Sequence, residues 1–498
     1  MRYKTSLLSA GQRVGDISEN AFGEGAMSVL AKEERRSARI RANEDEYGEA
    51  ARNLNWVTPE RADSAGAERQ GLLDAMGGRI RISSGGTKPH LGPLSPGCQV
   101  CVRGGWSCLF VNGRCNCRCF YCPAEQGEIG VPTTNRVAFS RAEDYAAYVR
   151  HFGFEGVSIS GGEPLLTFDR TLDYLNRIRK DAGDGVHLWL YTNGTLLTAE
   201  RADMLRDIGL NEIRFDIGAD GYALDKVRLA AGRIPCVTVE IPAVPEDMGR
   251  LCGMLAEMRE AGVDHLNLHQ LRLTPHNLPH LAGRGYTFLH GERVTVLESE
   301  LAALSLMANA AEGGRLPVNY CSFVYKNRYQ RAAMMRRSAD EIRKPHESVT
   351  ESGYIRSLTA SGPSDRILGT VKGLKQQDAD PKRWSASANM DRLFFHESLW
   401  ALIDADSFEI QTSYAEAMLS PRLSYRAFFR EVRLDSGATV FVERQPAGGP
   451  VILSERLKEP FRRAFLAREP GVGFPADIPE GRRILEREMV TPGLQNYY

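Results

Sequence analysis

Three cysteines on one short segment have a spacing that could hold a metal cluster. Cys115, Cys119 and Cys122 follow the pattern C-x3-C-x2-C. Cysteine thiolates hold iron–sulfur clusters, usually four of them for a [4Fe–4S] cube. Three ligands leave one iron without a protein ligand, and an open coordination position in a metal site is where substrate binds and reacts. The spacing therefore predicts a catalytic [4Fe–4S] cluster with one open iron.

Two C-x2-C pairs offer a competing interpretation. Cys98 and Cys101 form one pair, and Cys119 and Cys122 form the other, with residues 102–118 between them. This spacing is typical of a structural zinc site. Taken alone, the two pairs favour zinc, but a zinc ribbon does not require the additional cysteine, Cys115.

A glycine pair follows the predicted strand Gly156–Ser160, in the segment Gly161–Pro164. Two glycines let a ligand approach the backbone closely. We expect Glu163 to offer a carboxylate to an ammonium group and Pro164 to stiffen the turn. The alternative is an ordinary turn between a strand and a helix.

Asn193 lies in the segment Tyr191–Thr195, which closes the predicted strand His187–Tyr191. Reactive residues of α/β barrels lie at the C-terminal ends of the strands. We therefore expect Asn193 to hydrogen-bond a ribose or a carboxylate, although Asn-Gly is also a common turn pair.

The cysteine spacing, the aromatic Tyr121 before Cys122, and the segment 161–164 one βα unit later together resemble the radical S-adenosylmethionine (radical SAM) superfamily. The resemblance implies that the methionine part of S-adenosylmethionine chelates the open iron and that backbone groups of residues 161–164 hold its amino group. It also implies cleavage of this cofactor to a 5′-deoxyadenosyl radical, which abstracts hydrogen from a substrate. An electron donor such as flavodoxin or ferredoxin would reduce the cluster.

A narrower resemblance covers roughly residues 85–340. Pro-Gly-Cys-x2-Cys-x2-Gly at Cys98 and Tyr-Cys-Ser at Cys321 are similar to a little-characterised branch described as related to pyruvate formate-lyase activating enzyme. In that branch we expect an acidic stretch where this chain has Gln270 and Arg272, so a substrate role for a carboxylate there does not carry over.

Cys98, Cys101 and Cys321 are candidates for a second metal site, holding an auxiliary cluster or zinc. Cys108 or Cys117 could supply a fourth ligand. The alternative is that these residues are buried or free thiols, because a free cysteine packs as a small apolar side chain.

The fold is predicted to be α/β, with a partial (β/α)6 barrel, and an open doubly wound sheet is the alternative. Short apolar runs alternate with amphipathic helices, which is typical of parallel strands. The predicted strands are Cys108–Val111, Gly156–Ser160, His187–Tyr191, Glu212–Ile217, Val237–Ala243 and His265–Leu271. A capping box, residues 140–143, should open the first helix.

Four regions are expected along the chain. Residues 1–97 form a partly helical N-terminal extension, 98–333 the radical SAM domain, 334–389 an irregular linker, and 390–498 a small α+β accessory domain. Within the last region, residues 425–434 and 439–444 should form a β-hairpin around Asp435 and Gly437.

Composition constrains the partners. The formal net charge of the 498-residue chain is zero, and no apolar run has the length of a membrane span. We expect a cytoplasmic enzyme, an oxidoreductase or transferase, with no membrane or nucleic-acid partner.

A protein or peptide side chain is the preferred substrate. The alternatives are a small metabolite, RNA or a nucleotide, or a non-enzymatic zinc-binding module. RNA would use the arginines Arg328, Arg331, Arg336 and Arg337, whose other interpretation is a solvated helix face. His269 could face the barrel mouth and touch substrate.

Overall fold

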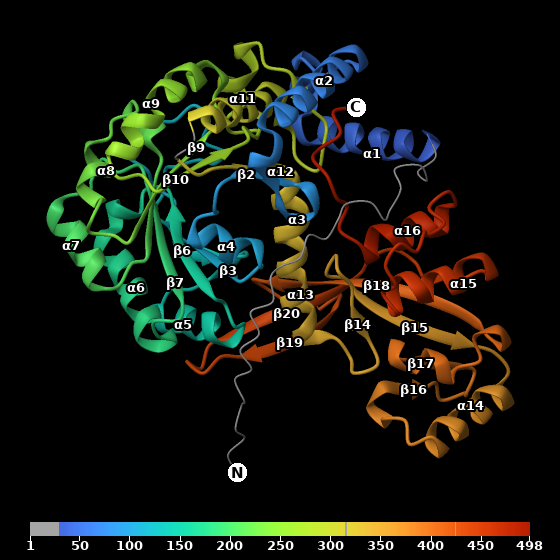
Figure 1. Ribbon diagram of the computed structural model, residues 1–498. Helices are drawn as coiled ribbons and strands as arrows, with labels where there is room; N and C mark the ends of the chain where they lie inside the picture. Colours follow the sequence, from blue (N-terminus) through green and yellow to red (C-terminus); the bar gives the residue numbers. More distant parts are fainter. Residues whose placement is uncertain (1–28, 314–315, 424) are drawn as a thin grey trace.

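The computed structural model describes residues 29–313, 316–423 and 425–498. Its centre is a curved parallel sheet with helices on the convex side (Figure 1). Within the described residues, seven strands pair in parallel, in the order β13-β10-β9-β8-β7-β6-β3. They are β3 (Trp106–Asn112), β6 (Gly156–Gly161), β7 (His187–Thr192), β8 (Glu212–Phe215), β9 (Cys236–Pro242), β10 (His265–His269) and β13 (Val318–Cys321).

The alternation of side chains along each strand explains the two faces of this sheet. In β8, Ile213 and Phe215 pack in the main apolar core, whereas Glu212 and Arg214 face the concave side and bond to one another. Helices cover the apolar side, which buries it from water. They are α5 (Ala142–His151), α6 (Phe168–Ala182), α7 (Ala199–Asp207), α8 (Asp225–Ala230), α9 (Met248–Glu260) and α11 (Leu297–Gly313).

The predicted fold class is confirmed, and each of the six predicted strands is present. The seventh strand, β13, was not predicted, because its four residues include the inward polar Asn319 and do not read as an apolar run. The predicted capping box is wrong. Helix α5 begins at Ala142 after Arg141, and the Arg141 side chain makes no capping bond.

The segment directly before the cysteines, the last part of the predicted N-terminal extension, contains strands and a helix. The strand β2 (Lys88–Leu91) pairs with β13 and with β1 (Ile80–Ile82), both antiparallel. The helix α4 (Pro96–Val102) then lies on the concave side of the sheet (Figure 1). A Cβ atom at Gly97 would lie 2.4 Å from Arg214 Nη2, so only glycine lets α4 approach so closely.

From residue 29 onward, the predicted N-terminal extension is part of the barrel body, and its residues 1–28 lie outside the described residues. It contains α1 (Val29–Tyr47), η1 (Gly48–Asn53) and α2 (Pro59–Met76). The Tyr47 hydroxyl donates to the carbonyl of Leu273, which follows β10, and residues of α2 pack with α11. Near the other end of the chain, the Tyr497 hydroxyl donates to Glu300 Oε1 of α11 at 2.6 Å.

The predicted irregular linker over 334–389 is wrong. It contains part of α13 (Arg331–Ile342), followed by β14 (Ser348–Val349), β15 (Ile355–Ser361), α14 (Ser364–Gln376) and β16 (Trp384–Ala386). Strand β15 is central in the C-terminal sheet, so the accessory domain begins well before residue 390. The remaining elements are β17 (Arg392–Phe395), β18 (Glu409–Ser420), β19 (Phe428–Arg433), β20 (Thr439–Pro446), β21 (Val451–Ile452), α15 (Glu455–Phe461) and α16 (Pro479–Glu488). Strands β19 and β20 confirm the predicted hairpin.

Helix α13 joins the barrel to the C-terminal sheet. Arg337 donates to the carbonyls of Gly104 and Phe152 on the barrel, and Arg331 donates to Glu416 of β18. Arg328 and Arg336 are bonded within the protein as well, so the four arginines considered for RNA binding are neither a solvated helix face nor cations without partners. No helix in the described ranges combines the length and apolar character that crossing a membrane requires.

The Gly97→Ala variant should be less stable than wild type, because the added methyl group would overlap Arg214 and Glu212. Overpacking of this kind costs about 1–3 kcal/mol. The measurement is the denaturant midpoint of unfolding. Gly66→Ala in α2 is the matched control, since a Cβ there meets nothing within 4 Å. An unchanged midpoint for Gly97→Ala would contradict the close packing of α4.

Candidate functional site

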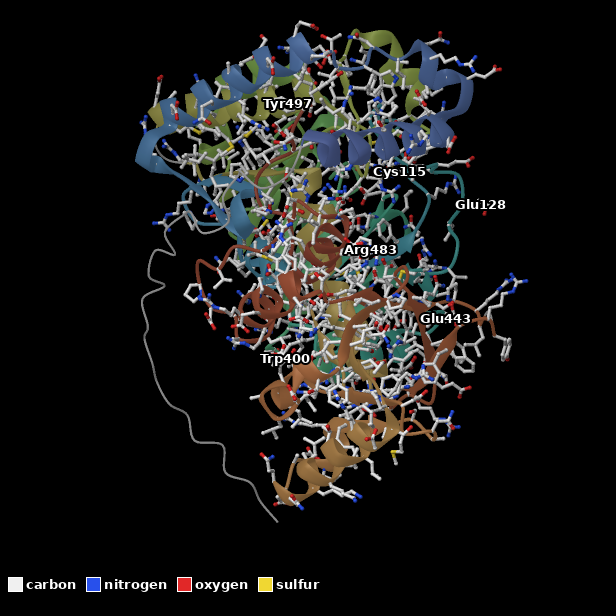
Figure 2. The ribbon with its side chains drawn as sticks, turned by 90° about the vertical axis from the view of Figure 1, so that its right-hand side faces the viewer. Cys115, Glu128, Trp400, Glu443, Arg483 and Tyr497 are labelled. Carbon is white, nitrogen blue, oxygen red and sulfur yellow. The ribbon has the colours of Figure 1, made fainter. Side chains whose placement is uncertain are left out.

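The cysteine segment forms a loop after β3, at the C-terminal edge of the parallel sheet. Cys115, Cys119 and Cys122 are all partly exposed, and a turn brings the last two together, with the Cys122 amide donating to the Cys119 carbonyl at 3.0 Å. Figure 2 shows Cys115 in the upper half of the molecule and Glu443 of the C-terminal sheet in the lower half. The loop therefore presents three thiols at the end of the barrel where reactive residues of such folds lie.

Nitrogen donors and a carboxylate lie next to these thiols. Asn193 Nδ2 is 3.7 Å from Cys115 Sγ and donates to Asn116 at 2.8 Å. Gln126 Nε2 is 2.7 Å from Cys122 Sγ. Burial, and then the charge of Asp216, raise the pKa of Cys119 to about 12. The predicted site residue Asn193 thus lies directly beside the cysteine loop.

The glycine pair contacts the backbone of the cysteine loop. A Cβ at Gly161 would lie 2.1 Å from the carbonyl oxygen of Asn112, and one at Gly162 would lie 2.1 Å from that of Arg114. Gly161 also has a φ of +131°, which side chains disfavour. The amides of Gly162 and Glu163 donate to the same two carbonyls at 2.9 and 2.8 Å. The glycines are required for this contact, and the close approach of a ligand to the same backbone stays a prediction.

The Glu163 carboxylate is fully buried and faces the end of β7. Its Oε1 accepts from the Leu165 amide and the Thr192 hydroxyl, at 2.9 and 2.8 Å. Its Oε2 accepts from the Asn193 amide at 2.7 Å. All three of these bonds are made within the protein, and a contact between this carboxylate and a ligand ammonium stays a prediction. Glu163 positions Asn193 through this amide bond, and Pro164 begins the short helix η3 (Pro164–Thr167).

Tyr121 makes a contact that the sequence did not reveal. Its hydroxyl donates to both carboxylate oxygens of Asp216, at 3.0 and 3.1 Å. Asp216 directly follows β8, and burial raises its pKa to about 6. Asn277 Nδ2 donates to the Tyr121 carbonyl. The signal for Asp216 in the sequence was its position as a polar residue near the end of the predicted strand Glu212–Ile217.

Cys98, Cys101 and Cys321 lie in a second region, around the buried Lys88. Asn267 Nδ2 is 3.3 Å from Cys98 Sγ, and the Tyr325 hydroxyl is 3.3 Å from Cys101 Sγ. Burial raises the pKa of Cys101 to about 11, although Lys88 opposes this.

The alternative zinc site built from both C-x2-C pairs is not formed. Cys98 and Cys101 lie in α4 on the concave side, whereas Cys119 and Cys122 lie on the loop near Asp216. Over the described residues, no three or more histidine, cysteine, aspartate or glutamate side chains are arranged to hold one metal ion. A second site at Cys98, Cys101 and Cys321, with Cys108 or Cys117 as a fourth ligand, stays a prediction.

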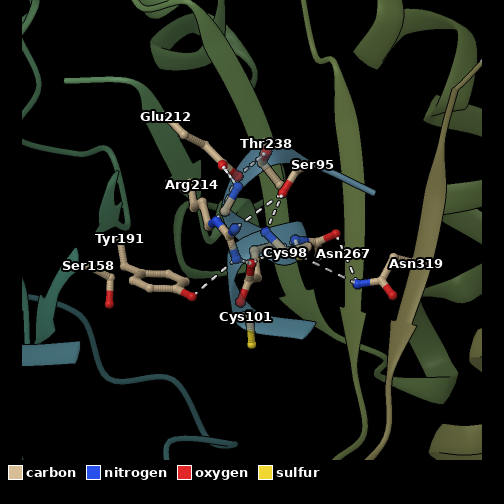
Figure 3. A network of polar contacts seen from close by, with 12 residues as sticks. Ser95, Cys98, Cys101, Ser158, Tyr191, Glu212, Arg214, Thr238, Asn267 and Asn319 are labelled. Carbon is tan, nitrogen blue, oxygen red and sulfur yellow. Dashed lines mark hydrogen bonds and ion pairs between the residues drawn. The ribbon is translucent and has the colours of Figure 1, made fainter. Parts of the chain in front are cut away.

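A chain of charged groups runs through the concave side of the barrel, and Figure 3 shows the part of it around Glu212 and Arg214. Arg214 donates to Glu212 at 2.8 Å and to Glu240 at 2.6 Å. Glu240 in turn contacts His269 Nε2 at 2.6 Å, and His269 Nδ1 is 3.1 Å from Lys326 Nζ. Burial alone would raise the pKa of Glu240, but Arg214 and then His269 hold it well below its usual range. This chain anchors α4 through the Gly97 amide, which donates to Glu212 at 2.8 Å.

Comparison with known proteins places the chain in a family. The model of the radical SAM superfamily matches residues 109–235. A Methanocaldococcus jannaschii protein named as a glycyl-radical enzyme activating enzyme is 30% identical over 274 residues, which cover 53% of this chain and 72% of the relative. A GTP 3′,8-cyclase of Aliarcobacter butzleri is 36% identical over 110 residues, or 22% of this chain and 32% of the cyclase. The structure of Streptococcus suis SuiB bound to S-adenosylmethionine aligns over 65% of this chain and 72% of SuiB, with 13% identity and a TM-score of 0.33.

The chain belongs to the radical SAM superfamily, which confirms the resemblance read from the cysteines and the glycine pair. It is an enzyme of S-adenosylmethionine-derived radical chemistry, and its cofactors are a [4Fe–4S] cluster and S-adenosylmethionine. The thiols at the barrel mouth suit this cluster, since thiolates are its usual ligands.

The Arg214→Met variant should unfold at a lower denaturant concentration than wild type. Removing the guanidinium leaves Glu212 and Glu240 buried without their main counter-charge. Breaking a buried pair in this way costs about 3–5 kcal/mol. Arg206→Met, which removes an exposed arginine paired on the surface of α7, is the control and should change stability by less than about 1 kcal/mol. Equal midpoints for the two variants would contradict the structural role of the charge chain.

Proposed function

We propose that Cys115, Cys119 and Cys122 hold the catalytic [4Fe–4S] cluster of this enzyme. The observation that carries the proposal is the arrangement of one three-cysteine loop against Gly161 and Gly162 at the mouth of a parallel barrel. When bound, the cluster and S-adenosylmethionine supply a 5′-deoxyadenosyl radical. The protein orients the cofactor and excludes competing reactions. Cys117 lies within the loop but has no place in the family spacing.

We propose that the backbone of residues 161–164 and the side chains of Tyr121 and Asn193 line the S-adenosylmethionine site. Glu163 fixes the amide of Asn193, and Asn193 lies beside Cys115. The Tyr121 ring is held by Asp216 at the other side of the loop. These contacts would keep the cofactor pocket rigid, which supports orientation of a reactive group.

A protein or peptide side chain is the substrate class that we favour. The Methanocaldococcus jannaschii relative, named as an activating enzyme for glycyl-radical enzymes, supports this choice. RNA is less well supported, because Arg331 and Arg337 are bonded within the protein, as is Arg336, which donates to the Glu351 carbonyl. We also propose flavodoxin or ferredoxin as the electron donor.

The cysteine assignment predicts a sharp difference between neighbouring variants. Cys115→Ala, Cys119→Ala and Cys122→Ala should each lose most cluster iron and all 5′-deoxyadenosine formation after anaerobic reconstitution and reduction. Cys117→Ala, a change within the same loop, should keep both. The measurements are iron and sulfide per chain and 5′-deoxyadenosine by chromatography. Full product formation by any of the first three variants would remove that cysteine from the ligand set.

The role of Glu163 predicts a weaker cofactor site without loss of the cluster. Glu163→Gln replaces one accepting oxygen by an NH2 group, which faces an N–H or O–H donor and leaves it unpaired. An unsatisfied buried group costs about 1–3 kcal/mol. We expect normal iron content and an affinity for S-adenosylmethionine at least several-fold lower, measured by isothermal titration. Wild-type affinity in this variant would show that Glu163 does not position the site.

The substrate class can be read from the fate of a labelled hydrogen. The enzyme is incubated with S-adenosylmethionine and either a deuterated protein extract or a deuterated extract of small molecules. Deuterium in 5′-deoxyadenosine should come from the protein fraction. Transfer from the small-molecule fraction alone would overturn the preference for a protein or peptide.

A further inference from the structure

Two buried nitrogen donors without partners lie just beyond the end of β10. The Gln270 side chain is 3% exposed, and its Oε1 accepts from the Phe323 amide at 3.2 Å. This bond fixes the orientation of the amide, because a flipped group would face a donor with a donor. Gln270 Nε2 is then left with no partner in the described part of the chain, and the same holds for Arg272 Nε. Buried donors of this kind are rare and call for an explanation.

Both donors lie around one aromatic residue, Phe323, together with a third donor, the ammonium of Lys326. The Arg272 guanidinium carbon is 5.9 Å from the centre of the Phe323 ring, and Lys326 Nζ is 4.9 Å from it. Lys326 also reaches His269 Nδ1, so its position is fixed by the charge chain of the barrel. We refer to Gln270, Arg272, Phe323 and Lys326 as the Phe323 corner.

The Phe323 corner lies at the same end of the barrel as the cysteine loop. Gln270 and Arg272 follow β10, and Phe323 and Lys326 follow β13, so all four lie beyond the carboxyl ends of parallel strands. Leu271 and Leu273 share an apolar cluster with Phe120 and Tyr121 of the cysteine loop. Asn277 links the same segment to the loop by donating to the Tyr121 carbonyl.

The balance of charge in the corner favours a bound anion. Burial and then the nearby Arg293 lower the pKa of Arg272, so its positive charge lacks full compensation. Glu46 is the acidic side chain that counteracts this, and it also lies 4.0 Å from Arg293. Glu240, the carboxylate that contacts His269, is already bonded to Arg214, His269 and Asn267.

We propose that the Phe323 corner binds an oxyanion of the substrate, a carboxylate or a phosphate. The amide NH2 of Gln270, the Nε–H of Arg272 and the ammonium of Lys326 would each donate to its oxygens. Charge-assisted bonds from such donors are short and strong. The inference rests on the proposed function, because it assigns a chemical class to the substrate that would bind at the barrel mouth beside the cysteine loop.

The test measures binding of inorganic phosphate and of acetate to the reconstituted, oxidised holoenzyme in the presence of S-adenosylmethionine. Isothermal titration should detect at least one of the two in wild type. Gln270→Glu keeps the acceptor for Phe323 and replaces the free donor by a negative acceptor. We expect this variant and Arg272→Gln to bind the anion about tenfold more weakly or worse, the effect of losing a charge-assisted bond. A preference for phosphate or for acetate identifies which oxyanion the corner takes.

Matched controls change the same residue types elsewhere. Arg331→Gln removes an arginine already paired with Glu416, and Gln411→Glu changes a glutamine on β18. Both should bind the anion as wild type does. The proposal is overturned if wild type binds neither anion, or if the corner variants bind it as tightly as the controls. It is also overturned if the corner variants lose affinity for S-adenosylmethionine instead, because the corner would then hold that cofactor's own carboxylate. Cluster iron and 5′-deoxyadenosine formed without substrate report separately on the proposed function.

Discussion

The close backbone contact between the cysteine loop and the glycine pair is the constraint on which the site depends. The carbonyl oxygens of Asn112 and Arg114 lie 2.1 Å from the positions that Cβ atoms would take at Gly161 and Gly162. Hydrogen bonds from the amides of Gly162 and Glu163 then fix the loop against β6. Since neither contact tolerates a Cβ atom, the position of the three thiols relative to the barrel is set by two residues that carry no side chain. Glu163 extends the same arrangement to Asn193 on the next strand.

A second constraint is the charge chain inside the barrel. Arg214 lies between Glu212 and Glu240, which is the pairing that buried charges require. One end of the chain holds α4 through the Gly97 amide, and the other end holds His269 and Lys326 near the mouth. The interior of this barrel is therefore polar, and its charges connect the helix with Cys98 and Cys101 to the side of the mouth where we place the substrate.

Much of the barrel and of its site was predictable from the sequence, because the signals are local. The C-x3-C-x2-C spacing and the Gly-Gly-Glu-Pro segment depend on neighbouring residues, and apolar runs marked six strands. What could not be predicted depends on distant contacts. Strand β13 has only four residues and includes the inward Asn319, and β15 occurs in a stretch rich in glycine and serine. The pairing of Tyr121 with Asp216 and the burial of the Glu163 carboxylate arise only when separate strands meet.

The central claim is that the cysteine loop carries a [4Fe–4S] cluster whose open iron takes S-adenosylmethionine. Electron paramagnetic resonance of the reduced enzyme, recorded with and without S-adenosylmethionine, tests it most directly. We expect the signal of a reduced [4Fe–4S] cluster whose g-values shift when S-adenosylmethionine is added, because the cofactor would become a ligand of one iron. A reduced enzyme with no such signal, or with a signal that S-adenosylmethionine leaves unchanged, would contradict it.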